Sequence, residues 1–202
     1  VHNKKKEVHL NTPGRRSPCA LMWSRAVSRL FSAGGSSKHA SSAPSSCGRH
    51  VTNNHQRTFL AVKPDGVHRG LIHDIIGRCE KRGFKMVAMK FLQPSLQLAR
   101  QHYVEHVGKP FFDDVTSYLC SGPVVAMVWE GHNIIKASRQ LVGSTDPSVA
   151  YPGTIRGDWA MSIERNLVHG SDSEASAARE IALWFSPEEL YDWQPISEQW
   201  MY

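Results

Sequence analysis

This 202-residue sequence contains no C-x-x-C cysteine pair, no apolar run long enough to span a membrane and no phosphate-binding loop of the common type. Its four cysteines include no C-x-x-C pair and no metal-ligand spacing, and they are divided between the two parts of the chain, which argues against a disulfide framework and favours a reducing compartment. No apolar run approaches the roughly 18 residues that a membrane-spanning helix needs. The pattern GxxxxGK[ST] is absent as well, so any phosphate chemistry must use another kind of site.

Acidic residues are scarce in the first quarter of the chain, and this asymmetry explains the net charge of +6. Residues 1–56 hold nine Lys/Arg and one Asp/Glu, a net charge of +8, whereas residues 57–202 hold fifteen and seventeen, a net charge of −2. The basic character therefore belongs to an N-terminal leader. A nearly neutral domain argues against a DNA-binding surface built from bulk charge, so we expect no nucleic-acid partner.

The leader carries one clear pattern, which begins at the first methionine, Met22. Apolar residues recur there at helical spacing, with Ser and Arg on the other face: Trp23, Ala26, Val27, Leu30 and Phe31. A Ser/Gly/Ala-rich stretch follows, and residues 22–56 contain no acid. This composition is typical of a mitochondrial targeting segment, and the alternative is a basic tail with a chance helix on a cytoplasmic protein. We predict a disordered leader over 1–56 and a folded domain over 57–202.

From residue 57 the apolar pattern alternates between strand and helix periods. Strands are predicted over 57–63, 84–91, 122–130 and within 159–168, and helices over 70–82, 96–104, 134–141 and 173–185, with one more ending at 118. This order predicts an α/β (α+β) two-layer sandwich, for which the ferredoxin-like four-stranded antiparallel sheet covered by helices is one standard solution. The long turn-rich stretch over 145–158 is predicted to be functional.

His169 lies where the fourth strand is expected to end and the last helix to begin. Gly170 allows the backbone to turn, and Ser171 with Glu174 matches the S-x-x-E pattern of a helix capping box. The helix after it is expected to carry a stripe of Ala175, Ala178 and Ala182. A histidine there faces a helix N-terminus, which attracts anions. It could equally be a structural turn histidine.

Polar residues gather at the ends of the predicted elements: Lys63, Arg139, Thr145, Arg156, Asn166, His169 and Glu180. A neutral histidine can attack a γ-phosphoryl group if a carboxylate such as Glu180 binds its N–H and leaves the other nitrogen free. Cations such as Lys63 would neutralise the phosphate charge. Taken alone, Lys63 could instead cap a strand edge, and Phe111 could be a hydrophobic plug rather than a platform for a base.

Four segments, 57–67, 121–131, 152–158 and 166–173, resemble the nucleoside diphosphate kinases, in particular their large hexameric eukaryotic group. The segment N-x-x-H-[GA]-S-D is the family's signature. The resemblance covers residues 57–202 and implies a ping-pong reaction. A nucleoside triphosphate would phosphorylate His169, and a nucleoside diphosphate would then collect the phosphate, which maintains the pools of nucleoside triphosphates other than ATP.

The resemblance also assigns roles to the remaining residues. Phe111 would stack on the base, Lys63 would reach the ribose and the phosphates, and Tyr103 would support the phosphate end of the site. Arg139, Thr145 and Arg156 would hold the phosphates, and Asn166 the sugar. Glu180 would bind the imidazole, with Ser171 beside it. Mg²⁺ would be carried on the nucleotide phosphates rather than by protein ligands.

The same resemblance implies a homo-hexamer, with subunit contacts made by the loop around Pro147 and by the tail at 200–202. The leader and residues 136–139 are most similar to the mitochondrial branch. Some mitochondrial relatives carry a basic triplet where this chain has Val107-Gly108-Lys109, so only a weak contact with anionic membranes is expected. Two other classes compete with the enzyme. One is a nucleic-acid-binding or regulatory protein that keeps the fold, which the domain's net charge of −2 disfavours, and the other is a membrane-tethering or scaffold protein.

Overall fold

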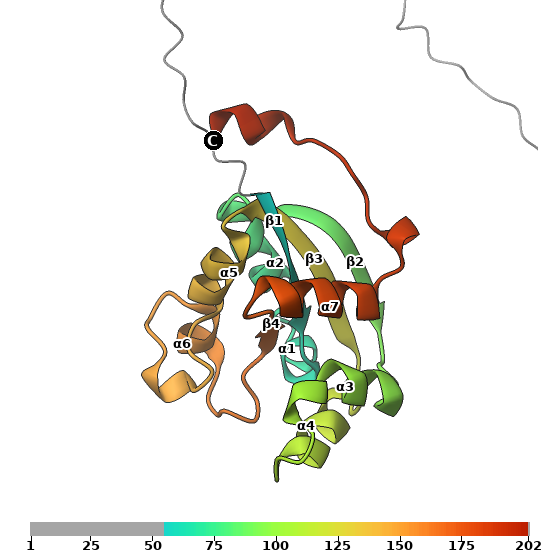
Figure 1. The fold of residues 1–202 in the computed structure, drawn as a ribbon. Coiled ribbons are helices and arrows are strands. Elements are labelled where there is room, and N and C mark those ends of the chain that lie inside the picture. The colour runs from blue at the N-terminus through green and yellow to red at the C-terminus, as the bar shows by residue number, and fades with distance from the viewer. Residues whose placement is uncertain (1–54, 202) are drawn as a thin grey trace, which may run out of the picture. The chain divides into compact units, whose positions relative to one another are not determined.

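The computed structural model describes residues 55–201, which contain a four-stranded antiparallel sheet (Figure 1). The strands are β1 (His55–Val62), β2 (Lys85–Leu92), β3 (Val124–His132) and β4 (Val168–Gly170), in the spatial order β2-β3-β1-β4. The predicted ferredoxin-like sandwich is confirmed, and the apolar run predicted for the third strand lies at the centre of the sheet. The predicted targeting segment lies outside the described residues.

Helices cover the sheet. Within residues 55–201, five lie close to predicted positions, and the two short ones at 64–68 and 155–159 were not predicted. The helices are α1 (Pro64–His68), α2 (Ile72–Lys81), α3 (Leu96–His102), α4 (Phe112–Leu119), α5 (Ile134–Val142), α6 (Ile155–Trp159) and α7 (Glu174–Trp184), with 3-10 turns at Val104–His106, Pro147–Val149, Pro187–Glu189 and Ile196–Trp200. Across residues 55–201, no helix has both the length and the apolarity to cross a membrane.

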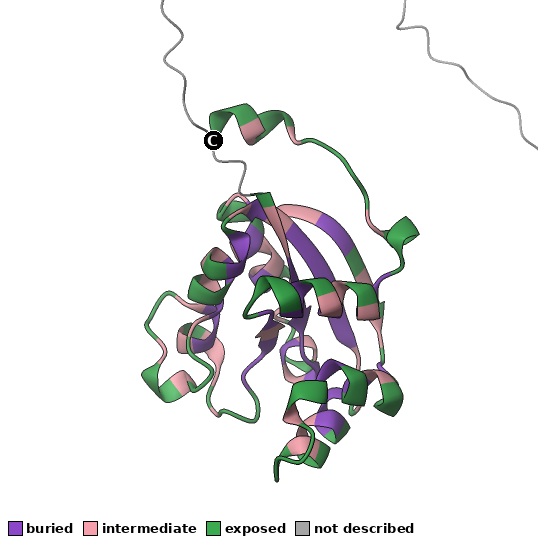
Figure 2. Ribbon diagram, in the orientation of Figure 1, coloured by how far each residue is buried: buried purple, intermediate pink, exposed green. Residues whose placement is uncertain are grey.

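Both faces of the sheet are buried, which explains why its strands read as near-continuous apolar runs. Because side chains alternate along a strand, Leu60 and Val62 join a cluster with α2 and α5, whereas Phe59 and Ala61 join a cluster with α3, α4 and α7. Figure 2 shows the buried residues concentrated on the strands and on the helix surfaces that face them. The core therefore has two layers, one on each side of the sheet.

Pro64-Asp65-Gly66 forms the first turn of the short helix α1. Pro64 fits there because its fixed φ is already helical and its missing N–H has no partner in a first turn. At Gly66 a Cβ atom would lie 2.7 Å from the side chain of Val62. The glycine therefore allows α1 to pack directly against the end of β1.

Two further predictions need correction. The stretch 145–158 contains a 3-10 turn and the start of α6, although it was expected to lack regular elements. The fourth strand is only three residues long, and it contains His169 instead of ending before it. The position of this strand is set by its pairing with β1, in which Ala61 lies opposite His169. The local sequence does not indicate this pairing.

The predicted capping box of the last helix is wrong. Ser173 is the N-cap of α7, and its side chain exchanges hydrogen bonds with Ser176. The hydroxyl of Ser171 points elsewhere and donates to Glu180. The predicted alanine stripe is also on the wrong face, because Ala175, Ala178 and Ala182 are exposed, and α7 buries Ser176, Ala177, Glu180 and Trp184 instead.

Candidate active site

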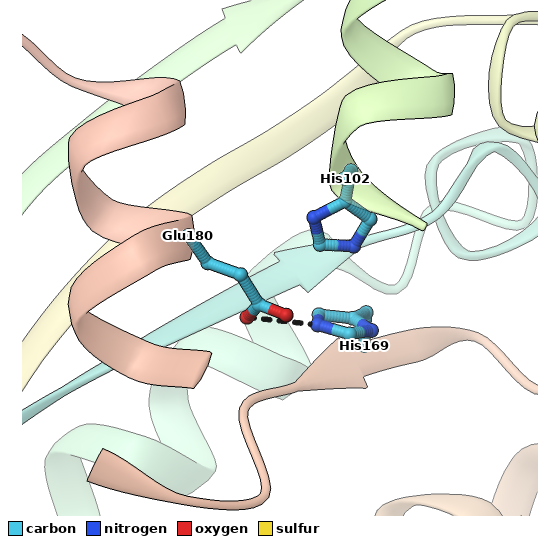
Figure 3. Close-up of side chains that lie close together, drawn as sticks. All are labelled: His102, His169 and Glu180. Carbon is cyan, nitrogen blue, oxygen red and sulfur yellow. Dashed lines mark hydrogen bonds and ion pairs between the residues drawn. The ribbon is translucent and has the colours of Figure 1, made fainter. Parts of the chain in front are cut away.

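His169 is held on the sheet face that α3 and α7 cover (Figure 3). Its neighbours Val168 and Gly170 are buried, and its own side chain is 22% exposed. Just before the strand, Leu167 has a φ of 69°, in the left-handed region that bulky residues rarely adopt. The imidazole is therefore reachable from solvent, although the backbone that carries it is enclosed.

The carboxylate of Glu180 fixes one side of the imidazole. His169 Nε2 lies 3.0 Å from Glu180 Oε2, and Ser171 Oγ donates to the same oxygen at 2.6 Å. Arg179 lies 3.6 Å from the other oxygen, Oε1, so the buried carboxylate has partners on both sides. We assign the neutral ring of His169 an Nε2–H that donates to Glu180, which leaves the lone pair of Nδ1 free.

His102 packs against the imidazole from α3, with ring centroids 4.3 Å apart and a T-shaped arrangement. Its Nδ1 accepts a hydrogen bond from Trp184 Nε1 at 3.1 Å, so its Nε2 carries the hydrogen. Burial, and after it the nearby His169, hold the pKa of His102 well below its usual value. His102 is therefore a neutral wall of the site, and Figure 3 shows one of its ring nitrogens directed at His169.

His102, His169 and Glu180 are the one group within residues 55–201 whose spacing could suit a metal ion, with ligand atoms within 4.8 Å of one another. A histidine that ligates a metal normally donates its other N–H to an acceptor. His102 does the opposite, because Trp184 donates to it, and its remaining nitrogen offers a hydrogen rather than a lone pair. Two imidazoles and one carboxylate also suit Mg²⁺ poorly, since this ion prefers oxygen ligands. These residues do not fit a resident metal ion.

Lys63 is the single residue between β1 and α1, and it is buried. Its Nζ donates to Asn166 Oδ1 at 2.5 Å, and Asn166 Nδ2 donates to the backbone carbonyl of Thr145 at 2.9 Å. Burial lowers the pKa of Lys63 to about 8, and the Asp65 carboxylate partly opposes this shift. A lysine that only caps a strand edge would be exposed, so that interpretation does not fit.

Arg156 on α6 is the second buried cation. Its guanidinium donates to the backbone carbonyls of Asn166 (3.3 Å), Gly143 (3.1 Å) and Val168 (2.8 Å). Burial, followed by the charge of Arg139, lowers the pKa of Arg156 to about 10. Arg156 therefore ties the segment before His169 to the end of α5.

The remaining predicted residues lie nearer the surface. Tyr103 is buried at the end of α3, and its ring lies 6.1 Å from His169. Phe111, at the N-cap of α4, is 47% exposed, which does not fit the plug interpretation. Arg139 and the side chain of Thr145 are exposed. The structure thus brings His169, Glu180, Ser171 and Tyr103 together, links Lys63 to Asn166, and leaves Phe111, Arg139 and Thr145 at the rim.

Known proteins resemble this chain in sequence and in fold. A family model described as nucleoside diphosphate kinase matches residues 56–190. The chain belongs to the nucleoside diphosphate kinase family. The "Nucleoside diphosphate kinase" of Heliobacterium modesticaldum is 54% identical over 146 residues, which are 72% of this chain and 98% of that protein. "Nucleoside diphosphate kinase B" of Bos taurus is 54% identical over 147 residues, 73% of this chain and 97% of that protein.

Solved structures agree with the family assignment. The nucleoside diphosphate kinase of Halobacterium salinarum in complex with CDP has a TM-score of 0.72 and 52% identity, covering 73% of this chain and 98% of that one. The family protein from Babesia bovis has a TM-score of 0.71 and 48% identity, with coverages of 73% and 99%. The chain is therefore an enzyme that transfers phosphate between nucleoside triphosphates and diphosphates.

Sequence reasoning missed several residues of this nucleoside diphosphate kinase site. His102 and Trp184 form the wall beside His169. Asp65 accepts hydrogen bonds from the backbone of Leu167, just before the strand that carries the histidine, and from the hydroxyl of Tyr118. His102 directly precedes Tyr103, and Asp65 lies in the Lys63–Gly66 segment, so their positions in the sequence were the available signals. The sequence contained no such signal for Trp184 and Tyr118, because both look like ordinary apolar residues of helices.

Proposed function

We propose that this nucleoside diphosphate kinase works by a ping-pong mechanism through a phosphohistidine at His169, and that it maintains the pools of nucleoside triphosphates other than ATP. The observation that carries the proposal is the 3.0 Å contact between His169 Nε2 and the buried Glu180 carboxylate. This contact reserves Nε2 for the proton and leaves Nδ1 as the nucleophile.

In the first step, the Nδ1 lone pair attacks the γ-phosphorus, and the bond to the β,γ-bridging oxygen breaks. The nucleoside diphosphate leaves with that electron pair. The positive charge that develops on the imidazole is balanced by Glu180, whose own position is held by Ser171. In the second step, a β-phosphate oxygen of another nucleoside diphosphate attacks the phosphorus, and the N–P bond returns its electron pair to Nδ1.

The other predicted residues would bind the nucleotide. Lys63 and Arg156 supply buried positive charge near β4, the strand that contains His169. Arg139 and Thr145 are exposed and would extend the phosphate site to the surface. Asn166 would bind the sugar, Tyr103 would support the phosphate end, and Phe111 would stack on the base. Stacking on one exposed ring reads a base only weakly, so we expect broad nucleotide specificity.

Mg²⁺ would enter with the nucleotide and be carried on its phosphates. The carboxylate nearest the nucleophile, Glu180, is already engaged by Ser171 and His169. Omission of Mg²⁺ is expected to stop phosphoryl transfer, whereas the melting temperature of the nucleotide-free protein should not change on addition of a chelator. A fall in that melting temperature would indicate a resident ion.

Formation of a labelled phosphoprotein tests the mechanism. With γ-labelled ATP, the wild type should form an acid-labile, alkali-stable phosphoprotein, and His169→Ala should form none. Glu180→Gln preserves the shape of the side chain but not its charge, so we expect phosphorylation to slow by about 10- to 100-fold. Glu174→Gln, on the exposed side of the same helix, is the matched control. An unchanged rate in Glu180→Gln would remove this carboxylate from the mechanism.

Mitochondrial import is proposed from the composition of residues 22–56. A fusion of this segment to a reporter should reach mitochondria, and a reporter that stays cytosolic would support the cytoplasmic alternative. Mass spectrometry of the mature N-terminus would locate the processing site.

A homo-hexamer is proposed from the family, and the exposed side chains of Tyr151 and Trp200 fit burial by neighbouring subunits. Light scattering of the purified protein should give the mass of six chains, and a monomer at micromolar concentration would contradict this. Contact with anionic vesicles should be weak, since Lys109 is the only cation in the 107–109 segment.

A further inference from the structure

We propose that Asp65 and Tyr118 are positioning residues that hold the backbone in front of His169 in the shape needed for phosphoryl transfer. The inference rests on the proposed function of His169. It concerns a chain of hydrogen bonds that runs from α4, through α1, to the residue two positions before the histidine. Neither residue touches the imidazole, so they would act through Leu167.

Leu167 is the strained point of this segment. Its φ of 69° lies in the left-handed region, which costs a residue with a side chain about 1–2 kcal/mol. Its side chain is fully buried in the core, so the residue cannot relax by turning outwards. A conformation of this kind persists only where its surroundings hold it.

Both backbone groups of Leu167 are held by the segment at the start of α1. The N–H donates to Asp65 Oδ2 at 3.0 Å, and the carbonyl accepts from the N–H of Lys63 at 2.8 Å. Leu167 and Asp65 are 102 positions apart in the sequence. One local bond also closes the turn, since the N–H of Val168 donates to the carbonyl of Asn166 at 2.8 Å. The left-handed turn before His169 is therefore held both locally and by a distant element.

Tyr118 of α4 holds Asp65 from the other side. Its hydroxyl donates a hydrogen bond to Asp65 Oδ1, while Oδ2 remains with Leu167. Burial, followed by the hydrogen bond to Asp65, raises the pKa of Tyr118, which keeps the hydroxyl protonated and able to donate. With one oxygen on each partner, the carboxylate has little freedom to rotate away from Leu167.

The ring of Tyr118 also contacts the cations around the site. The Arg165 guanidinium lies 4.0 Å from its centroid, and Lys63 Nζ lies 5.3 Å away. The same helix begins next to Phe111 at the rim. Tyr118 thus connects α4, the helix that follows Phe111, to the backbone just before His169.

A second explanation for Asp65 is its charge. The carboxylate raises the pKa of the neighbouring Lys63, so its loss could weaken a phosphate-binding cation rather than misplace the histidine. The substitution Asp65→Asn separates the two explanations. The carbonyl oxygen of the new amide can still accept from Leu167, and its NH₂ can donate to the Tyr118 oxygen, but the charge is gone.

The experiment compares Asp65→Ala, Asp65→Asn and Tyr118→Phe with the wild type, and Tyr191→Phe is the control because that ring is 70% exposed. The readouts are the rate of phosphoenzyme formation at saturating ATP in a single turnover, the Kd for ADP by calorimetry, and amide hydrogen exchange of the peptide that contains Leu167. The exchange measurement does not depend on activity.

If the two residues position the histidine, the rate should fall about 30-fold in Asp65→Ala and about 5- to 10-fold in Tyr118→Phe, with Kd changed by less than about threefold. Asp65→Asn should keep the rate within about threefold of the wild type. Exchange at Leu167 should accelerate in Asp65→Ala and Tyr118→Phe but not in Asp65→Asn.

Three results would overturn the proposal. An equal loss in Asp65→Asn and Asp65→Ala would assign the effect to charge on Lys63. If Tyr118→Phe has the same phosphorylation rate and the same exchange as the wild type, the Tyr118 hydroxyl does not hold the Asp65 carboxylate in position. A Kd that rises while the rate stays constant would assign the residues to nucleotide binding.

The positioning proposal and the proposed function fail in different ways. If the wild type forms no phosphohistidine, the proposed function fails, and the exchange data still test the contact with Leu167. If Asp65→Ala does not fold, Asp65→Asn and Tyr118→Phe still give opposite expectations.

Discussion

The inner part of the site and its rim are built differently. The inner residues Lys63, Arg156, Asn166, Ser171 and Glu180 are buried, and each has hydrogen-bond partners within the chain. At the rim, by contrast, Phe111, Arg139 and Thr145 present exposed side chains. The buried groups are thus held in place before a nucleotide binds, whereas the exposed groups, which would contact the outer parts of the nucleotide under the proposed function, have more freedom to adjust. Preorganised dipoles and charges are effective in catalysis because they need no rearrangement during the reaction.

The inner arrangement has a cost in stability. Two cations are enclosed there, and burial lowers the pKa of both Lys63 and Arg156. A buried charge with incomplete pairing is unfavourable until an anion enters. The site is therefore less stable without substrate than a nonpolar one would be, which is the usual trade between stability and activity.

Replacement of Arg156 should give the largest effect of this comparison. Arg156→Ala leaves three backbone carbonyls without their donor, so we expect the free energy of unfolding to fall by about 3 kcal/mol and the phosphorylation rate to fall by at least about 100-fold. Urea unfolding at a fixed protein concentration and single-turnover kinetics measure the two changes.

Arg139→Ala is the matched arginine variant from the rim. It should change the free energy of unfolding by less than about 0.5 kcal/mol and weaken ADP binding about tenfold. Equal destabilisation by both substitutions would contradict the division into a fixed interior and an adaptable rim.

Lys63 should give an intermediate effect that depends on pH. Its pKa is about 8 in the folded chain against an ordinary value of 10.5. Below pH 8 the ammonium is charged in both states, and the cost of burying it is fully present. Between these two values the unfolded chain holds a proton that the folded chain has released, so the unfolding free energy rises with pH.

Lys63→Met should remove this cost. We expect the variant to be more stable than the wild type by about 1–2 kcal/mol at pH 7, after allowance for the lost contact with Asn166, and the difference should shrink towards pH 10. The variant should also phosphorylate slowly. A stability difference that stays constant between pH 7 and pH 10 would show that the ammonium is not buried in solution.

Phe111 should give the smallest effect. Phe111→Ala removes a ring that is half exposed, so stability should change by less than about 0.5 kcal/mol. Loss of base stacking should raise the Kd for nucleotides by about 5- to 10-fold, with similar increases for ADP, GDP and CDP. Calorimetry with the three diphosphates measures this, and Phe111→Trp should restore binding. An increase confined to one base would show that the ring contributes to specificity.

The sequence predicted the elements better than their ends. Apolar runs as strong as 122–130 placed the central strands, because a strand buried on both faces needs apolar residues throughout. The three-residue strand β4 was misplaced, since so short an element carries no period of its own and exists only through pairing with β1. The exposed alanines of α7 were misplaced because alanine favours any helical position and does not show which side is buried.

Local sequence also could not distinguish between alternative partners. Ser171 fits a capping box as well as Ser173 does, and only the approach of Glu180 decides that its hydroxyl faces the active site. His102 and Tyr118 carry no local sign of their roles, because each acts on a residue of another element.

The sequence by itself determined the four-stranded sandwich and the family, because these follow from periodicity and from short motifs, and it predicted His169 and the polar residues near it as the site. Only the tertiary structure decided which nitrogen of His169 is free, which cations are buried, and what holds Leu167 in its left-handed conformation. The physical reason is distance along the chain. Asp65 and Leu167 are 102 positions apart, and Lys63 and Asn166 are 103 apart, so no local pattern records their contact.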